Sequence, residues 1–204
     1  QPYEAVKLHM LNASHSLLGL SGVLSGYRVV SEIMADLNEV TLVEQYLGYD
    51  AEPLLSAPPG MALSEYGRRL LHRFRNRAIS DQLLRIASDS TSKLPMFIRS
   101  TAMGVIAHHR PVARIAFVVA CYAEYLRGHD DRGETYVIVE PHLTEEDRIL
   151  AASSRLEDAL GMSALAGWGL AEHPAFVQAY VALRQSIRAH GTRATLATVI
   201  SAGK

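Results

Sequence analysis

The sequence has few of the features that mark secreted, membrane-spanning or nucleic-acid-binding proteins. Cys121 is its only cysteine, so no disulfide can form within the chain, which is typical of a reducing compartment. No apolar run approaches the roughly 20 residues that a membrane-spanning helix needs, and no signal peptide is visible. The formal net charge is −1, without blocks of like charge. We therefore expect a cytoplasmic protein with neither nucleic acid nor a membrane as its partner.

The sequence also lacks a nucleotide-binding fingerprint. Its one glycine cluster consists of Gly19, Gly22 and Gly26, which does not fit G-x-G-x-x-G and follows a helical pattern rather than a strand. A dinucleotide site needs strand, tight turn and helix N-terminus together. These glycines are better explained by close helix packing or helix termination. A zinc site would need three or four converging ligands, and the histidine pair His108–His109 is better explained as a helix end.

What the sequence does have is helical periodicity along nearly its whole length. Pro53, Pro58 and Pro59 make 48–60 a loop, and the β-branched segment 135–139 is the one strand candidate. Helices are predicted at 3–24, 27–46, 64–74, 83–86, 95–108, 111–126, 143–153, 155–166 and 174–190. Ser80 or Asp81 is a candidate N-cap of the short helix. The fold class predicted is all-α: a single multi-helix domain over 1–204, with at most one short strand or hairpin.

The first predicted helix carries three polar residues of different type, Lys7, Asn12 and His15. On an α-helical wheel they fall at about 0°, 140° and 80°, on one broad face. A lysine in a partly desolvated pocket can accept a hydroxyl proton. An asparagine N–H can stabilise charge on the reacting oxygen, and a histidine can orient the substrate. Each residue alone is more often a solvated or locally bonded side chain, so periodicity does not decide between these interpretations.

Longer sequence motifs, which include these three residues, also point to a function. The stretch from Tyr3 to Ser16 resembles K-L-x-x-L-N-[GA]-S-H-S, a pattern at the start of the C-terminal, substrate-binding domain in the mannitol dehydrogenase and fructuronate reductase family. The segments 73–76, 85–95 and 173–191 also resemble family segments, so the resemblance covers nearly all of the chain. Ala13 stands where the family usually has glycine, which leaves the polar triplet untouched.

The resemblance implies a zinc-independent secondary-alcohol oxidoreductase that uses NAD or NADP. Lys7 would be the general base, Asn12 and His15 would bind the reacting oxygen, and Arg85 and Lys93 would bind the substrate. The substrate would be a polyol or a sugar acid, of the mannitol/fructose or mannonate/fructuronate type. Without the resemblance, Arg85 and Lys93 would be taken as solvated side chains.

The family binds its cofactor on an N-terminal Rossmann domain that we expect to be absent from this chain, which begins at Gln1. That domain would be the partner of this one, and the chain alone is expected to be inactive. The alternative is a non-catalytic helical domain, derived from the same family, that serves in binding or dimerisation. The intact Lys7, Asn12 and His15 triplet favours the enzyme, because a degenerate domain need not keep all three.

Overall fold

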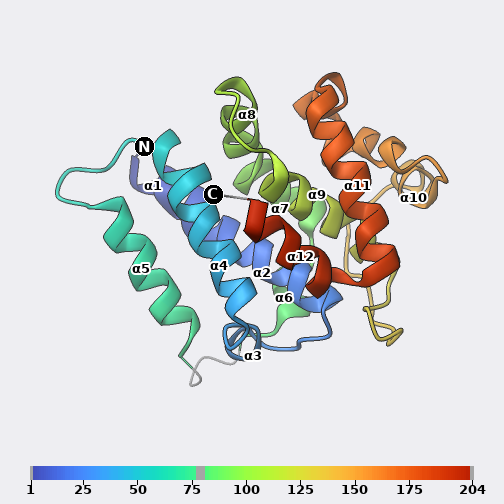
Figure 1. Ribbon diagram of the computed structural model, residues 1–204, viewed down its shortest axis with the longest axis horizontal. Coiled ribbons are helices and arrows are strands. Elements are labelled where there is room, and N and C mark those ends of the chain that lie inside the picture. The colour runs from blue at the N-terminus through green and yellow to red at the C-terminus, as the bar shows by residue number, and fades with distance from the viewer. Residues whose placement is uncertain (1, 77–80, 203–204) are drawn as a thin grey trace.

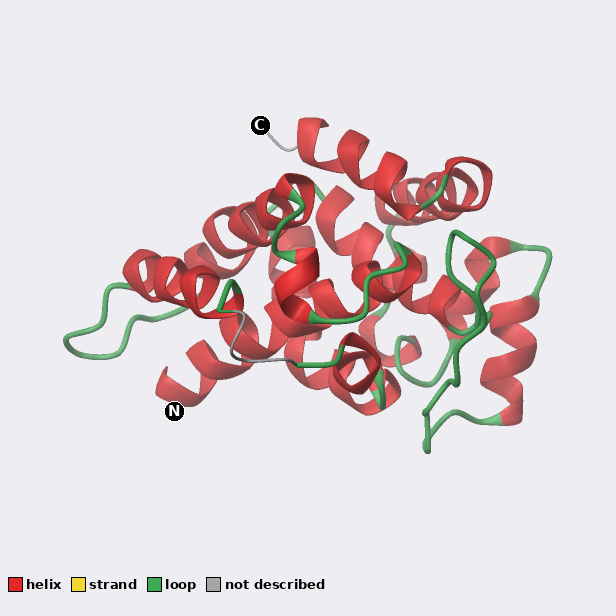
Figure 2. Cartoon of the chain, turned by 90° about the horizontal axis from the view of Figure 1, so that it is seen from below, coloured by secondary structure: helices red, strands yellow, loops and turns green. Residues whose placement is uncertain are grey.

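The computed structural model describes residues 2–76 and 81–202 and is built from helices joined by loops (Figure 2). The structure is 71% helical, which confirms the predicted fold class. Among the described residues the only β pairings are two isolated bridges, Val29 with Gln82 and His129 with Thr135. Segment 135–139 therefore does not form the strand that its β-branched residues suggested, because apart from the bridge at Thr135 it pairs with no neighbouring strand. No described helix is long and apolar enough to cross a bilayer.

The first helix is continuous from Pro2 to Leu24 but changes its hydrogen-bond register. It comprises α1 (Pro2–Val6), the π-helical η1 (Lys7–Asn12) and α2 (Ala13–Leu24). Every residue of α2 except His15 is buried, so this helix forms the centre of the domain (Figure 1). It packs against the helices α6 (Leu83–Ala87) and α9 (Ala113–Tyr125).

The remaining helices surround this centre. In Figure 1, α5 lies at one end of the molecule and α10 and α11 lie at the other. The bounds are α3 (Val30–Ile33), α4 (Leu37–Gln45), η2 (Tyr46–Ala51), η3 (Glu52–Leu54), α5 (Leu63–Phe74), α7 (Ser90–Phe97), α8 (Arg99–Ala107), α10 (Glu145–Ala152), η4 (Leu156–Gly161), η5 (Ala166–Trp168), η6 (Leu170–Glu172), α11 (Pro174–His190) and α12 (Thr192–Ala202).

Two glycines of α2 bring α6 close to the central helix. A Cβ atom on Gly19 would lie 2.8 Å from Ile86 Cγ2, and one on Gly22 would lie 2.8 Å from Leu83 Cδ1. Gly26, with φ of +84°, follows the end of the helix. The glycine cluster is thus explained by packing and termination, as the sequence indicated.

Several predicted boundaries are wrong. The expected helix 27–46 is divided into α3 and α4, and helix 95–108 into α7 and α8. Segment 155–166 forms 3₁₀ turns rather than one α-helix, and α12 was not predicted. The N-cap of α6 is Gln82, without a side-chain cap, instead of Asp81; Ser80 lies outside the described residues.

Pro95 does not open its helix, because α7 begins at Ser90. The carboxylate of Glu140 explains the early start: its oxygens accept from the backbone N–H of Ser90 at 2.8 Å and of Thr91 at 2.9 Å. Thr91 Oγ1 also donates to Glu140, over 2.7 Å. A helix start leaves four N–H groups without intrahelical partners, and here a residue about fifty positions away in the chain satisfies two of them.

Candidate substrate site

The change of register in the first helix bears directly on Lys7 and Asn12. The backbone N–H of Ala13 reaches the carbonyl of Leu8, an i→i+5 bond that defines π-helical structure, which is frequent at functional sites. Lys7 and Asn12 are themselves five positions apart. An i→i+5 turn stacks residues five apart more closely than an α-helix does, where they point about 140° apart. The π segment therefore rotates Lys7 toward the side of the helix that carries Asn12.

Four of the five residues singled out from the sequence share one pocket of about 240 Å³, here called the Asn12 pocket. It lies where α2, α6 and α7 meet. Its lining comprises Asn12, His15, Ser16, Asp81, Arg85, Ile86, Lys93 and Phe97. Lys7 is not among the lining residues, and its side chain is exposed. The structure thus brings Asn12, His15, Arg85 and Lys93 together and leaves Lys7 outside the pocket lining, one π-helical turn before Asn12.

His15 is the one residue of α2 that is half-buried rather than fully buried. Its ring packs against Phe74, with 4.7 Å between the ring centroids. Burial lowers the pKa of His15 below its usual value. The nearby Arg73, Arg85 and Lys93 cations lower it further, and Asp81 opposes them. His15 is therefore neutral at pH 7, with one ring nitrogen able to donate and the other able to accept a hydrogen bond.

Lys93 is a half-buried lysine whose Nζ donates to the carbonyl of Ile86 at 3.1 Å and to that of Ser88 at 2.5 Å. These carbonyls lie at the C-terminal end of α6, where carbonyl groups lack intrahelical partners. Desolvation lowers the pKa of Lys93, with a smaller contribution from Arg85, and is opposed by Asp89 and Glu140. Lys93 thus connects α7 to α6 and keeps one N–H of its ammonium for the pocket.

Arg85 points its guanidinium to Asp81, with 2.5 Å between Nη2 and Oδ1. The Arg85 side chain is 68% exposed and that of Asp81 is 35% exposed. The backbone of Asp81 is fixed, because its carbonyl accepts from Val30 N at 3.0 Å. Asp81 was predicted only as a helix cap; its position four residues before Arg85 is the signal for an i,i+4 ion pair.

Two further polar side chains near the pocket were also missed. Ser16 lines the pocket, and its Oγ donates to the carbonyl of Asn12 at 3.3 Å. His9, within the π segment, has Nδ1 3.0 Å from the carbonyl of Phe97 and Nε2 3.1 Å from Ser100 Oγ. These contacts attach the π segment to α7 and α8. A histidine or serine in an apolar helix gives no signal that distinguishes such a role.

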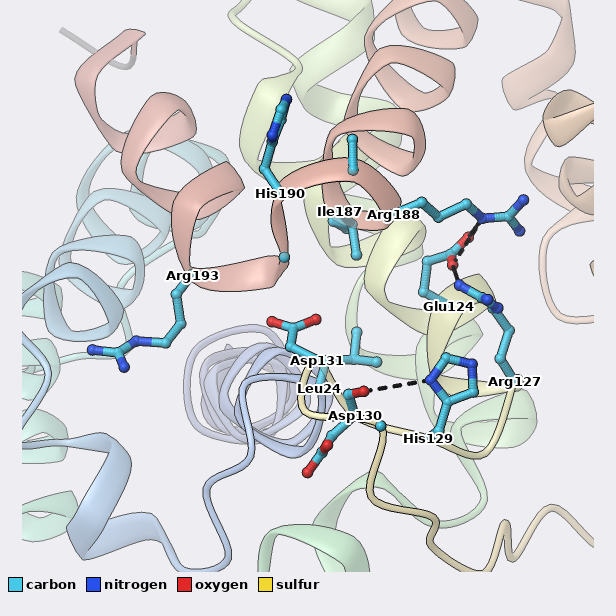
Figure 3. A pocket seen from close by; sticks show the side chains of 13 residues that line it. Leu24, Glu124, Arg127, His129, Asp130, Asp131, Ile187, Arg188, His190 and Arg193 are labelled. Atoms are coloured by element: carbon cyan, nitrogen blue, oxygen red, sulfur yellow. Dashed lines mark hydrogen bonds and ion pairs between the residues drawn. The ribbon is translucent and has the colours of Figure 1, made fainter.

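A larger cavity of about 560 Å³ lies between the end of α9 and the turn from α11 to α12 (Figure 3). Its charged side chains already have structural partners. Asp131 accepts from the backbone N–H of Thr192 at 2.6 Å and so caps α12. Glu124 forms ion pairs with three arginines, Arg127, Arg184 and Arg188. Asp130 accepts from Arg28 at 3.0 Å. The charged groups beside this cavity therefore join α9, α11 and α12 to one another.

No group of three or more His, Cys, Asp or Glu residues in 2–76 and 81–202 is arranged to hold a metal ion. Cys121 is buried, as expected of a core residue. The polar groups that line the Asn12 pocket are thus an amide, an imidazole, a hydroxyl, an ion pair and an ammonium group. Such a set suits hydroxyl groups, which both donate and accept hydrogen bonds.

Comparison with known proteins agrees with this geometry. The family profile described as mannitol dehydrogenase C-terminal domain matches residues 1–188. A polyol:NADP oxidoreductase from Gluconobacter oxydans is 41% identical over 194 residues, which are 95% of this chain and 40% of that protein. A mannitol 2-dehydrogenase from Aspergillus fumigatus is 33% identical over 202 residues, again covering 40% of the relative.

Solved structures show the same relationship. The ternary complex of Pseudomonas fluorescens mannitol 2-dehydrogenase with NAD and D-mannitol matches with a TM-score of 0.93 and 37% identity. That match covers 98% of this chain and 41% of the other. A D-sorbitol dehydrogenase in substrate-free form matches with a TM-score of 0.89 and 38% identity, over 96% of this chain and 40% of that one. The chain thus spans about two fifths of the length of these relatives, and it belongs to the mannitol dehydrogenase family, whose C-terminal domain it matches.

Proposed function

We propose that this chain is the substrate-binding part of an NAD(P)-dependent dehydrogenase that interconverts a polyol and its ketose. The observation that carries the proposal is the convergence of Asn12, His15, Arg85 and Lys93 on one pocket. The names of the relatives support the substrate class: a polyol:NADP oxidoreductase and a mannitol 2-dehydrogenase crystallised with D-mannitol. Within a polypeptide that also carries a nucleotide-binding domain, this pocket holds the alcohol to be oxidised.

The cofactor would be held outside this chain. The described residues include no β-strand followed by a phosphate-binding turn and a helix. In the glycine cluster, Gly19 and Gly22 are in close contact with side chains of neighbouring helices. NAD or NADP, once bound by the other domain, supplies the hydride acceptor. The chain described here accordingly supplies substrate contacts and the proton acceptor, and by itself it should show no turnover.

Each residue then has a separate role. Lys7 Nζ takes the proton of the substrate hydroxyl as the carbon loses hydride. The Asn12 side-chain N–H donates to the oxygen on which charge develops. His15, neutral because burial lowers its pKa, donates to or accepts from the same oxygen or its neighbour. Arg85 and Lys93 hold hydroxyl groups farther along the substrate.

The exposed position of Lys7 places one condition on this mechanism. Lys7 must reach the substrate from the rim of the Asn12 pocket, and the π register supports this because it brings residues five apart toward one side of the helix. Desolvation of its amine must come from the bound substrate and the adjoining domain, because the described residues leave it exposed. Lys93 is more desolvated, but two backbone carbonyls hold its ammonium group, so we assign it to binding.

The test uses Lys7→Ala and Lys7→Arg in the enzyme that joins this chain to its nucleotide-binding domain. Removing a general base typically costs 10²–10⁴-fold in rate, so we expect a loss of about 3–5 kcal/mol in transition-state stabilisation, with cofactor binding retained. Lys7→Arg keeps the charge but cannot accept a proton near neutral pH, and it should be as slow as Lys7→Ala.

The pH profile of polyol oxidation provides the second measurement. It should lose one rising ionisation in both variants, because the group whose deprotonation activates the alcohol has been removed. Near-wild-type oxidation by Lys7→Ala with an unchanged profile would refute the role of Lys7. Absence of polyol turnover in the wild-type enzyme would refute the proposed function and support a non-catalytic binding or dimerisation domain.

A further inference from the structure

The charges in the Asn12 pocket are already partly matched by groups of the chain itself. Arg85, the cation best suited to bind a carboxylate in a bidentate way, is paired with Asp81 at 2.5 Å. Lys93 directs two hydrogen bonds to the carbonyls of Ile86 and Ser88. Arg85 is therefore presented to the pocket as a paired charge, whereas Lys93 keeps its positive charge because backbone carbonyls are neutral.

Asp81 adds a negative charge to the same lining. Its Oδ1 receives the Arg85 bond, and a carboxylate has further acceptor sites on both oxygens. The backbone of Asp81 is bound to Val30 on one side, and Leu83 N donates to the carbonyl of Arg28 at 2.9 Å on the other. The carboxylate is thus anchored beside Arg85 by main-chain contacts as well as by the ion pair.

A neutral polyol and a sugar acid meet this arrangement differently. A polyol hydroxyl can donate to Asp81 and accept from an Arg85 N–H, so it joins the ion pair without breaking it. A substrate carboxylate can only accept hydrogen bonds, and it lies beside a fixed like charge. Two like charges about 4 Å apart repel each other, and the repulsion is stronger near a protein surface than in bulk water. To bind Arg85 in a bidentate way, the acid must compete with Asp81.

We propose that Asp81 is a specificity-determining residue that selects uncharged polyols over sugar acids, by occupying Arg85 and by placing a carboxylate in the Asn12 pocket. The inference rests on the proposed function, since it assumes that this pocket binds the alcohol. It goes beyond that function because it assigns a role to a residue outside the Lys7, Asn12, His15, Arg85 and Lys93 set, and it decides between two substrate classes.

The experiment compares D-mannitol with D-mannonate, which carries a carboxylate in place of one terminal CH₂OH group. kcat/KM for oxidation of each is measured in the complete enzyme for the wild type, Asp81→Asn and Glu65→Gln. Glu65 forms the matched control pair, because it contacts Arg69 in the same i,i+4 spacing but lies on α5, outside the Asn12 pocket. Circular dichroism and cofactor affinity verify that each variant is folded.

Asp81→Asn should lower the mannitol-to-mannonate ratio of kcat/KM by about 10–100-fold, because the amide carries no charge that repels the mannonate carboxylate. Glu65→Gln should leave the ratio unchanged. A folded Asp81→Asn enzyme with the wild-type ratio would overturn the inference while leaving the proposed function intact. A wild-type enzyme that oxidises neither compound would instead overturn the proposed function.

A measurement on the wild type keeps the inference testable if Asp81→Asn fails to fold. D-mannonate should inhibit mannitol oxidation at least 10-fold more weakly than a neutral, non-reacting polyol of equal length, and raising the ionic strength should reduce the difference because salt screens the repulsion. Equal or stronger inhibition by D-mannonate would overturn the inference.

Discussion

Two charged regions of this domain differ in how far water reaches them. In the Glu124 cluster, formed by Glu124, Arg127, Arg184 and Arg188, the carboxylate is 2% exposed and receives all three guanidinium groups at 2.7–3.0 Å. In the Asn12 pocket, Asp81 and Arg85 form a pair that stays 35% and 68% exposed. The first region joins α9 to α11, whereas the second lines an open pocket.

The pKa values follow the same division. Burial alone would raise the pKa of Glu124, but hydrogen bonds and charges from Arg188 and Arg184 outweigh it and hold the pKa below its usual value. In the Asn12 pocket, burial is the largest cause of the pKa shifts, and it lowers the pKa of both His15 and Lys93. Fully paired charges thus stabilise the fold, and incompletely paired, partly desolvated groups are left for a ligand.

The largest expected effect breaks the Glu124 cluster. Arg184→Met removes a fully buried guanidinium that also donates to the carbonyl of Leu156 at 2.9 Å. Loss of one partner of a buried pair costs about 3–5 kcal/mol in the free energy of unfolding, which denaturant titration measures. Arg69→Met, at an exposed pair on α5, should cost less than about 1 kcal/mol. Similar losses in both variants would show that the cluster is not structural.

A smaller effect tests how α7 is positioned. Glu140→Ala removes three hydrogen bonds from the first turn of α7, which carries Lys93. A hydrogen bond to a charged group contributes about 1.5–3 kcal/mol. Because the burial of the Glu140 carboxylate offsets part of the sum of its three bonds, unfolding should become easier by about that amount in total. Glu134→Ala, at an exposed carboxylate, serves as the control and should change stability by less than 1 kcal/mol. A Glu140→Ala domain as stable as the control would contradict this role.

The third effect, the smallest when taken per pH unit, is a dependence of stability on pH. Glu39 is completely buried, which raises its pKa to about 8; Asp36 adds to the shift, and Ser21 and Arg193 oppose it. Because the folded state holds this proton more tightly, stability is highest below the unfolded pKa near 4.5 and falls as pH rises toward 8. Each pH unit in that window costs at most about 1.4 kcal/mol.

Glu39→Gln should flatten this slope between pH 5 and 8, because the amide does not titrate. Glu44→Gln, on the exposed side of the same helix, should leave the slope as it is. Thermal unfolding at a series of pH values measures both. An identical slope in wild type and Glu39→Gln would mean that Glu39 binds its proton equally in the folded and unfolded states.

The fold class could be predicted because it depends on local patterns: apolar spacing predicted a helix at 3–24, observed from Pro2 to Leu24, and the helix α11. That Arg85 and Lys93 act together with Asn12 and His15 was implied by the family resemblance. The roles given to these residues, and to Lys7, stay predictions.

What the sequence could not reveal depends on distant contacts. The start of α7 at Ser90 requires the carboxylate of Glu140, and the start of α12 requires that of Asp131. The π segment between Lys7 and Asn12 contains His9, which contacts α7 and α8. None of these partners is near in sequence, so helical periodicity alone misplaced the boundaries and missed α12.

The central claim, that the Asn12 pocket binds the reacting alcohol, is tested most directly by kcat/KM for polyol oxidation in Asn12→Ala and Asn38→Ala. Removing an amide donor to a developing oxyanion costs about 10²–10³-fold, so Asn12→Ala should lose that factor with stability nearly unchanged. Asn38, on α4 and outside the pocket, should be replaceable without loss. Equal activity of the two variants would show that the pocket does not contact the reacting oxygen.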